Sequence, residues 1–344
     1  MENVRRALGG ASLALLFMAC NEPKAPERAG APSAESSSAP ALVSLRLGGP
    51  WNAAAGKVPK ATGAFGYAVE LGLAQPILAR HGYVFAGFVP FNNGPPVFQA
   101  LQAGSIEVGT FGDTPAVAGR ASGIASRVIV VDKPVGDAWL LAKKGVTRIE
   151  ELAGKRVGLQ FGSNFDKYGR GVLKAAGLLD RVELINISIG DSFAALLRGD
   201  IAAVGVPAAT AANWLGREQF PVLDRASKTH PLLQGTSVTV VTEAFFSAHS
   251  NIQTAFWEAT RAGIDAIHKD KEKYLRFISA ANGLDLEAVR QSSPLRYGDR
   301  PIDLEGAASV RSTLDFLLDF GIAKAPFSLD DWFVNGPKEG GKAL

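Results

Sequence analysis

The sequence contains very little cysteine: Cys20 is its single cysteine among 344 residues. One cysteine cannot form a disulfide within the chain, so a buried core has to hold the fold together. The four histidines lack the spacing typical of a metal site; they are His81, His230, His249 and His268. We therefore expect neither a disulfide framework nor a metal.

Several short motifs of enzymes and nucleotide-binding proteins are also absent. The chain has no G-x-x-x-x-G-K-[ST], G-x-G-x-x-G, H-E-x-x-H or G-x-S-x-G segment. Its formal net charge of +3 falls to +2 without residues 1–19, which carry Arg5, Arg6 and Glu2. This small charge is not typical of nucleic-acid binding. We expect no cofactor, no nucleic-acid partner and no enzymatic activity.

The N-terminal segment has the pattern of a secretory signal peptide. Arg5 and Arg6 precede a short apolar run, Ala7 to Met18, with the small residue Ala19 before Cys20. The run is shorter than the roughly 20 apolar residues of a membrane span. The segment 15–20 resembles a bacterial lipobox, which implies lipidation of Cys20 and anchoring to a membrane at the periplasm or cell surface. The alternative is a plain signal peptide with a chance cysteine.

The rest of the chain divides by composition. Residues 20–41 would form the lipidated cysteine and a disordered tether, because this stretch is mostly Ala, Pro, Ser, Glu and Lys and has little to bury. Residues 338–344 would form a flexible C-terminal tail. The part between is larger than one usual domain and suits two lobes. We expect a monomer.

Strands and helices alternate along this central part, which predicts an α/β fold with parallel sheets. Helices are predicted from about residue 251 onward, where apolar residues recur every three or four positions. Residues 100–106 and 195–201 share a helix–glycine–strand pattern, in which Gly104 and Gly199 suit the left-handed position after a helix. The predicted strands are 42–48, 83–91, 106–111, 127–131, 138–142, 157–161, 182–187, 201–206 and 238–241, and the predicted helices include 67–80, 95–103, 168–176 and 193–198.

Three loops that follow predicted strands open directly into helices. Such loops lie at the sheet edge where ligands bind in α/β proteins, and helix N-termini attract anions. The alternative for each loop is a capped helix without a ligand. The loops are Gly112-Asp113-Thr114-Pro115, Gly162-Ser163-Asn164-Phe165-Asp166 and Gly190-Asp191-Ser192.

The segment from Glu150 to Ser163, E-E-L-A-G-K-R-V-G-L-Q-F-G-S, resembles a motif of periplasmic solute-binding proteins. Weaker matches follow the same order at 98–109, 112–115 and 243–249. The nearest branch is the aliphatic-sulfonate, taurine and nitrate-binding group of ABC transporters, with its pyrimidine-binding relatives. The resemblance covers about residues 42–325.

This resemblance implies a type II periplasmic-binding fold, with two α/β lobes and a ligand cleft between them. Lobe 1 would comprise residues 42–136 and 245–337, and lobe 2 residues 137–244. The closed, ligand-bound form would deliver its solute to an inner-membrane ABC permease. The expected ligand-binding residues are Trp51, Asn52, Asn93, Gly94, Gly112, Asp113, Thr114, Gly162, Ser163, Asn164 and Asp191.

The sequence departs from the family pattern in ways that leave the ligand open. Family members often have an acidic residue where Ala202 stands, and its absence argues against taurine. A sulfonate, nitrate or taurine-like solute remains the first expectation. The alternatives are a receptor for a pyrimidine precursor, a lipoprotein that senses its ligand, and, last, an enzyme on this fold.

Overall fold

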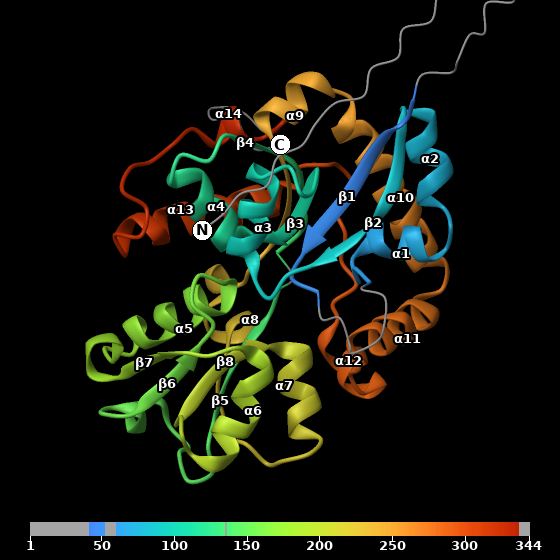
Figure 1. Cartoon of the computed structure of the whole chain (residues 1–344). Coiled ribbons are helices and arrows are strands. Elements are labelled where there is room, and N and C mark those ends of the chain that lie inside the picture. Colours follow the sequence, from blue (N-terminus) through green and yellow to red (C-terminus); the bar gives the residue numbers. More distant parts are fainter. Residues whose placement is uncertain (1–40, 52–59, 135, 337–344) are drawn as a thin grey trace, which may run out of the picture. The chain divides into compact units, whose positions relative to one another are not determined.

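The computed structural model describes residues 41–51, 60–134 and 136–336. Within these ranges the strands form two separate five-stranded sheets, which can be followed in Figure 1 by their strand labels. We call the first sheet with its helices lobe 1 and the second sheet with its helices lobe 2. No helix in the described ranges has the length and apolar character needed to cross a membrane.

The sheet of lobe 1 has the strand order β2-β1-β3-β10-β4. β1 pairs in parallel with β2 and β3, whereas β10 runs antiparallel to both β3 and β4. The carboxyl ends of β1, β3 and β4 therefore lie at one edge of the sheet. The bounds in this order are Tyr83–Pro90, Val43–Gly49, Val108–Gly112, Ser237–Thr242 and Ser126–Val131.

Helices cover both faces of this sheet, which explains why its central strands are almost continuously apolar. α1, α2 and α10 pack on one face, and α3, α4, α13 and α14 pack on the other. The helices of lobe 1 are α1 (Ala64–Glu70), α2 (Ala74–Arg80), α3 (Gly94–Gln102), α4 (Asp113–Ala121), α9 (Glu243–Ala248), α10 (Ile252–Lys269), α11 (Lys271–Asn282), α12 (Leu286–Ser292), α13 (Leu304–Asp319) and α14 (Leu329–Trp332).

Lobe 2 repeats this architecture with the strand order β7-β6-β8-β5-β9. β6 pairs in parallel with β7 and β8, and β5 runs antiparallel to β8 and β9. The strands are β7 (Glu183–Asn186), β6 (Arg156–Leu159), β8 (Ala203–Pro207), β5 (Ala138–Ala142) and β9 (Val222–Arg225); the helices are α5 (Asn164–Ala175), α6 (Ile189–Arg198), α7 (Ala208–Leu215) and α8 (Ala226–Thr229), with short 3-10 turns at Ile149–Leu152, Leu179–Arg181 and Pro231–Leu233.

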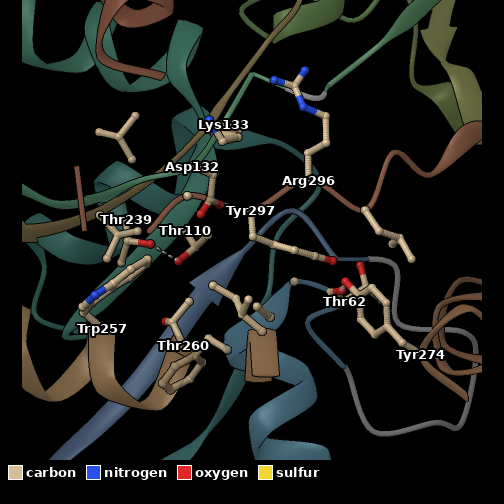
Figure 2. Close-up of a pocket in the computed structure, with 18 of the residues that line it drawn as sticks. Thr62, Thr110, Asp132, Lys133, Thr239, Trp257, Thr260, Tyr274, Arg296 and Tyr297 are labelled. Atoms are coloured by element: carbon tan, nitrogen blue, oxygen red, sulfur yellow. Dashed lines mark hydrogen bonds between the residues drawn. The ribbon is translucent and has the colours of Figure 1, made fainter. Parts of the chain in front are cut away.

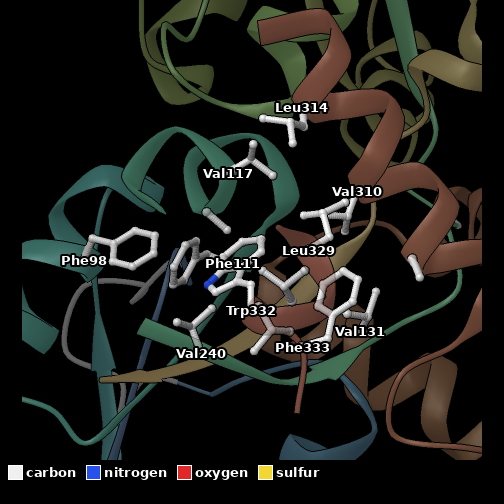
Figure 3. Packing of buried hydrophobic residues seen from close by; sticks show 14 of the residues in the cluster. Phe98, Phe111, Val117, Val131, Val240, Val310, Leu314, Leu329, Trp332 and Phe333 are labelled. Carbon is white, nitrogen blue, oxygen red and sulfur yellow. The ribbon is translucent and has the colours of Figure 1, made fainter. Parts of the chain in front are cut away.

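The largest apolar cluster of lobe 1 lies under α3, α4, α13 and α14 (Figure 3). Phe98 and Phe111 pack edge to face with their ring centroids 5.0 Å apart, a favourable aromatic geometry. Trp332 is completely buried, and its indole N–H donates a hydrogen bond to Ser126 Oγ at 3.1 Å. This contact satisfies the one polar group of a large buried side chain, so the C-terminal helices are fixed on the sheet.

The structure confirms the α/β fold and corrects the expectation of parallel sheets. Each sheet is mixed, because β10 in lobe 1 and β5 in lobe 2 run antiparallel to their neighbours. The helix predicted over 67–80 is two helices, α1 and α2. Gly72 lies between them at φ +72°, which ends the first helix. Gly104 and Gly199 both have positive φ, as predicted.

One lobe boundary is also wrong in the prediction. Lobe 2 was expected to extend to residue 244, but β10 (Ser237–Thr242) pairs with β3 and β4 of lobe 1. The chain has therefore already returned to lobe 1 before residue 237. Residues 1–19, the segment 20–40 with Cys20, and the tail 338–344 lie outside the described residues, so their predicted roles stay predictions.

Candidate functional site

A cavity of about 350 Å³ lies in lobe 1, at the edge of the sheet where β1, β3 and β4 end. Trp51 follows β1, Thr110 lies in β3 and Asp132 comes directly after β4; all three line the cavity. This is the sheet edge at which α/β proteins bind ligands. The volume is also within the usual range for small-molecule sites, about 300–1,000 Å³.

The wall opposite the sheet comes from α10, α11 and the segment between α12 and α13. Figure 2 shows Tyr274 and Tyr297 with their hydroxyls close together, next to Thr62. The Tyr274 hydroxyl donates to the Thr62 carbonyl at 2.6 Å. Burial raises the pKa of Tyr297 to about 12, with a further contribution from the Asp132 charge. Burial also raises the pKa of Tyr274, so both tyrosines stay protonated at neutral pH. Tyr274 already donates to Thr62, which leaves the Tyr297 hydroxyl as the donor for a ligand.

The sheet side of the cavity combines hydroxyl groups with aromatic rings. Thr110 and Thr239 are cross-strand neighbours on β3 and β10, and their hydroxyls share a hydrogen bond of 3.0 Å (Figure 2). Phe65 and Phe256 stack with their centroids 4.1 Å apart, and both line the cavity. The site is thus mostly apolar with a few polar groups, as is typical of organic-ligand sites.

Asp132 places a carboxylate in this cavity. Its side chain lines the cavity (Figure 2) and remains exposed to solvent. Desolvation by the protein around the cavity, with a further contribution from the charge of Asp303, raises the pKa of Asp132 to about 7. In the described part of the chain, its carboxylate has no hydrogen-bond donor and no ion-pair partner within 4 Å.

Three cationic side chains also border the cavity, and each one is paired with a carboxylate. Their charges are therefore compensated before any ligand arrives. The pairs are Lys133 with Glu305 at 2.7 Å and with Asp303 at 3.3 Å, Arg296 with Glu305 at 2.9 Å, and Arg300 with Asp299 at 3.2 Å.

Among the ligand-binding residues predicted from the sequence, Trp51 is the one that lines this cavity. Its ring packs edge to face on Phe88, with centroids 5.3 Å apart. Asn52 lies outside the described residues. The other predicted residues lie at the contact between the two lobes or on lobe 2.

The structure brings the Gly112 loop of lobe 1 directly against the Gly162 loop of lobe 2. Asn164 Oδ1 accepts a hydrogen bond from the Thr114 backbone N–H at 3.0 Å, and its Nδ2 donates to the Thr236 carbonyl at 3.3 Å. A Cβ on Gly112 would lie 2.5 Å from Asn164 Oδ1. The two loops that the sequence placed at the cleft therefore do meet, with Asn164 as the contact.

Asp113 is completely buried at this contact. Its carboxylate accepts hydrogen bonds from the Thr313 hydroxyl at 2.5 Å and from the Thr236 backbone N–H at 3.3 Å. The Lys167 ammonium lies 3.5 Å away. Donors from the protein itself thus occupy this carboxylate in the structure.

Three of the other predicted residues have structural roles. Ser163 caps α5 through the backbone N–H groups of Phe165 and Asp166. Asp191 is exposed and accepts a hydrogen bond from Ser188 Oγ at 2.6 Å. Gly162 has a φ of +73°, which a side chain would strain.

Two polar atoms at these loops have no partner in the described ranges. Asn93 Oδ1 and Thr114 Oγ1 are both buried and lack a hydrogen bond there. Gly94, next to Asn93, lets α3 approach α4, because a Cβ at this position would lie 2.3 Å from Pro115. A ligand group is one way to satisfy such atoms.

Sequence reasoning missed most of the cavity. Asp132 follows the predicted strand 127–131 and satisfies the same edge-of-sheet rule that selected Gly112. The position of Asp132 after a strand end could be read from the sequence. No helix begins directly after it, however, so the search for strand-to-helix loops did not select it. Arg296 and Tyr297 lie in a segment without apolar periodicity, and nothing in their spacing indicates that they reach the end of β4.

Comparisons with known proteins agree with this geometry. The model of the "NMT1/THI5 like" family matches residues 87–273, just over half of the chain. The taurine-binding periplasmic protein of Escherichia coli is 28% identical over 180 residues, which are 51% of this chain and 54% of that protein. The matched region thus spans about half the length of this relative.

Solved structures show the same fold. The alkanesulfonate-binding protein SsuA from Xanthomonas axonopodis pv. citri, bound to MOPS, aligns with a TM-score of 0.71 at 18% identity, covering 87% of this chain and all of that chain. The desulfurization enzyme DSZB aligns with a TM-score of 0.61, also at 18% identity, covering 85% and 96%. From the family match, supported by this fold, the chain belongs to the NMT1/THI5-like family.

Proposed function

We propose that this chain is the substrate-binding component of an ABC importer, which captures a small organic solute and delivers it to a membrane permease. The observation that carries the proposal is the cavity at the carboxyl edge of β1, β3 and β4, lined by aromatic and hydroxyl groups. The solute-binding proteins among the relatives favour binding over catalysis, so the proposal is a receptor and not an enzyme.

The relatives indicate which solutes to test first. A taurine-binding and an alkanesulfonate-binding protein are among them, so the proposal begins with sulfonates, nitrate and taurine. Pyrimidine precursors are the alternative that the sequence resemblance suggested. The proposal includes a ligand-dependent movement of the lobes, since hinge closure is common in two-lobed binding proteins; the contact between Thr114 and Asn164 is one that such a movement would change.

Purified residues 21–344 should be screened by thermal shift against these four classes of solute. A bound ligand stabilises the folded state by RT ln(1 + [L]/Kd), about 2.7 kcal/mol at a hundredfold excess over Kd. Enzymatic conversion of a solute, with no solute raising the melting temperature, would contradict the receptor function. Uptake by cells that carry the chain together with a permease would separate transport from ligand sensing.

The proposal includes a lipid anchor on Cys20 and a periplasmic or cell-surface location. Replacing Cys20 by serine should release the protein from the membrane fraction without changing its affinity for the solute. A matched Ser37→Ala variant in the tether should stay in the membrane fraction. If the Cys20→Ser protein also remained there, the anchor would have to be placed elsewhere.

A further inference from the structure

The charge of the cavity points to one kind of ligand. The cationic groups at its border each hold a carboxylate of the protein, at distances of 2.7–3.3 Å. Asp132 is different, because its carboxylate faces the cavity with no compensating cation among the described residues. A negative group in this position attracts a cation and repels an oxyanion.

Aromatic side chains line the same cavity as this carboxylate. Trp257 and Tyr297 lie on different sides of the cavity in Figure 2, and the other aromatic lining residues are Trp51, Phe65, Phe256 and Tyr274. The faces of aromatic rings attract organic cations, and most strongly where water is displaced. A carboxylate and aromatic rings that line one cavity therefore supply two interactions that favour the same ligand charge.

A metal ion is not a suitable occupant. The described residues hold no group of three His, Cys, Asp or Glu side chains that could bind a metal. Asp303, whose charge acts on Asp132, is paired with Lys133 and caps α13 through the Gly306 backbone N–H at 3.0 Å. One carboxylate with aromatic neighbours fits an organic ammonium group better than a metal.

We propose that Asp132 is the counter-ion for an ammonium group of the solute, so that this cavity selects small organic amines with an apolar or aromatic body. The inference rests on the proposed receptor function and narrows its substrate class. The Tyr297 hydroxyl and the Thr110–Thr239 pair supply hydrogen bonds to other polar atoms of the solute. An acidic solute without an amine is disfavoured at this site.

Three probes with the same ring and different charge test the inference in the full mature chain. Benzylamine is a cation, benzyl alcohol is neutral and benzenesulfonate is an anion. Titration calorimetry at pH 8 should show binding in the order benzylamine, benzyl alcohol, benzenesulfonate. The first should exceed the second by roughly tenfold or more, as expected for a charge-assisted contact.

Asp132→Asn should remove this preference and leave benzylamine and benzyl alcohol with similar affinities. The matched control is Asp265→Asn, the same substitution at an exposed position of α10, which should bind like the unmodified protein. Melting curves of both variants check that they fold. The charge series on the unmodified protein is a test that does not depend on any variant.

The inference is overturned if benzylamine does not bind, if benzyl alcohol binds equally well, or if Asp132→Asn retains the preference for the amine. Binding of benzenesulfonate in place of benzylamine would also overturn it while supporting the receptor function. Failure of the receptor function itself would show differently, as the absence of any ligand among sulfonates, nitrate, taurine and pyrimidines.

Discussion

The Lys167 ammonium of lobe 2 lies 3.5 Å from the Asp113 carboxylate of lobe 1, and both side chains are almost completely buried, with exposed fractions of 1% and 0%. The Thr313 hydroxyl connects them: it accepts from Lys167 at 2.8 Å and donates to Asp113 at 2.5 Å. A buried ion pair of this kind contributes less than its Coulomb energy, but removing one partner leaves an uncompensated charge. The pair therefore couples the stability of the two lobes.

Lys167→Met should reduce the free energy of unfolding by about 3–5 kcal/mol, because Asp113 loses its cation in a buried site. Adding Asp113→Asn should recover part of the loss. The control is Lys174→Met on the same helix, whose ion pair with Asp319 is exposed, and it should cost less than about 1 kcal/mol. Urea unfolding measures all three. If Lys167→Met and Lys174→Met lost the same free energy of unfolding, the buried pair would contribute no more to stability than the exposed one.

Gly112→Ala should destabilise the contact between the lobes. The added Cβ would lie 2.5 Å from Asn164 Oδ1, so Asn164 must move and release the Thr114 N–H. We expect a loss of about 1–3 kcal/mol, typical of overpacking. The backbone of Gly112, at φ −64°, tolerates alanine, so the cost is steric.

Gly190→Ala in α6 is the matched control for that substitution. Its added Cβ would have Ser188 Oγ as its nearest neighbour, at 3.8 Å. Alanine also favours a helix over glycine by up to about 1 kcal/mol, so this variant should be as stable as the unmodified protein or more so. Thermal melts compare the two. If Gly112→Ala melted at the same temperature as Gly190→Ala, the close packing of Asn164 would be disproved.

These contacts show which parts of the structure could be predicted from the sequence. Local rules identified most strands, and the glycine–polar loops at Gly112 and Gly162 do lie against each other. The strand β10 was found but assigned to the wrong lobe, because pairing with β3 depends on a return of the chain that no local pattern encodes. Asp132 and Tyr297 meet across 165 positions of sequence, so only the folded structure brings them together.

Asp132→Asn should stabilise the empty protein, and more so at high pH. The folded-state pKa of Asp132 is raised to about 7 from an ordinary value of 3.8, so between these values the folded state binds more protons than the unfolded state. Its contribution to stability therefore falls as the pH rises from about 4 to 7. Asparagine removes this loss.

The shift of about three units corresponds to about 4 kcal/mol for a fully buried group. Because the Asp132 side chain is exposed, solvent screens part of this energy, and we expect Asp132→Asn to be more stable at pH 8 by less than this figure. At pH 4 the two proteins should be nearly equally stable. Melting temperatures at both pH values measure the difference, and a difference that is the same at pH 4 and pH 8 would exclude the raised pKa.

Amine binding should follow the ionisation of the same carboxylate. The charged and titratable groups around Asp132 are Lys133 and Asp303, which pair with each other, Tyr274 and Tyr297, whose pKa values are raised by burial, and the cavity-lining Arg296 and Arg300, which pair with Glu305 and Asp299. The raised pKa values of Lys133, Tyr274 and Tyr297 keep the charges of these three groups constant between pH 6 and pH 8. His268 contacts Tyr297, with ring centroids 6.0 Å apart, and is the group to control for.

Benzylamine stays protonated over this range, so its affinity should follow the fraction of ionised Asp132. With a pKa of about 7, that fraction is about tenfold lower at pH 6 than at pH 8, and the affinity should fall by about the same factor. Asp132→Asn should show a flat profile, whereas His268→Gln should keep the tenfold change. If the pH dependence disappeared in His268→Gln but persisted in Asp132→Asn, its source would be the histidine. Asp132 would then no longer support amine recognition.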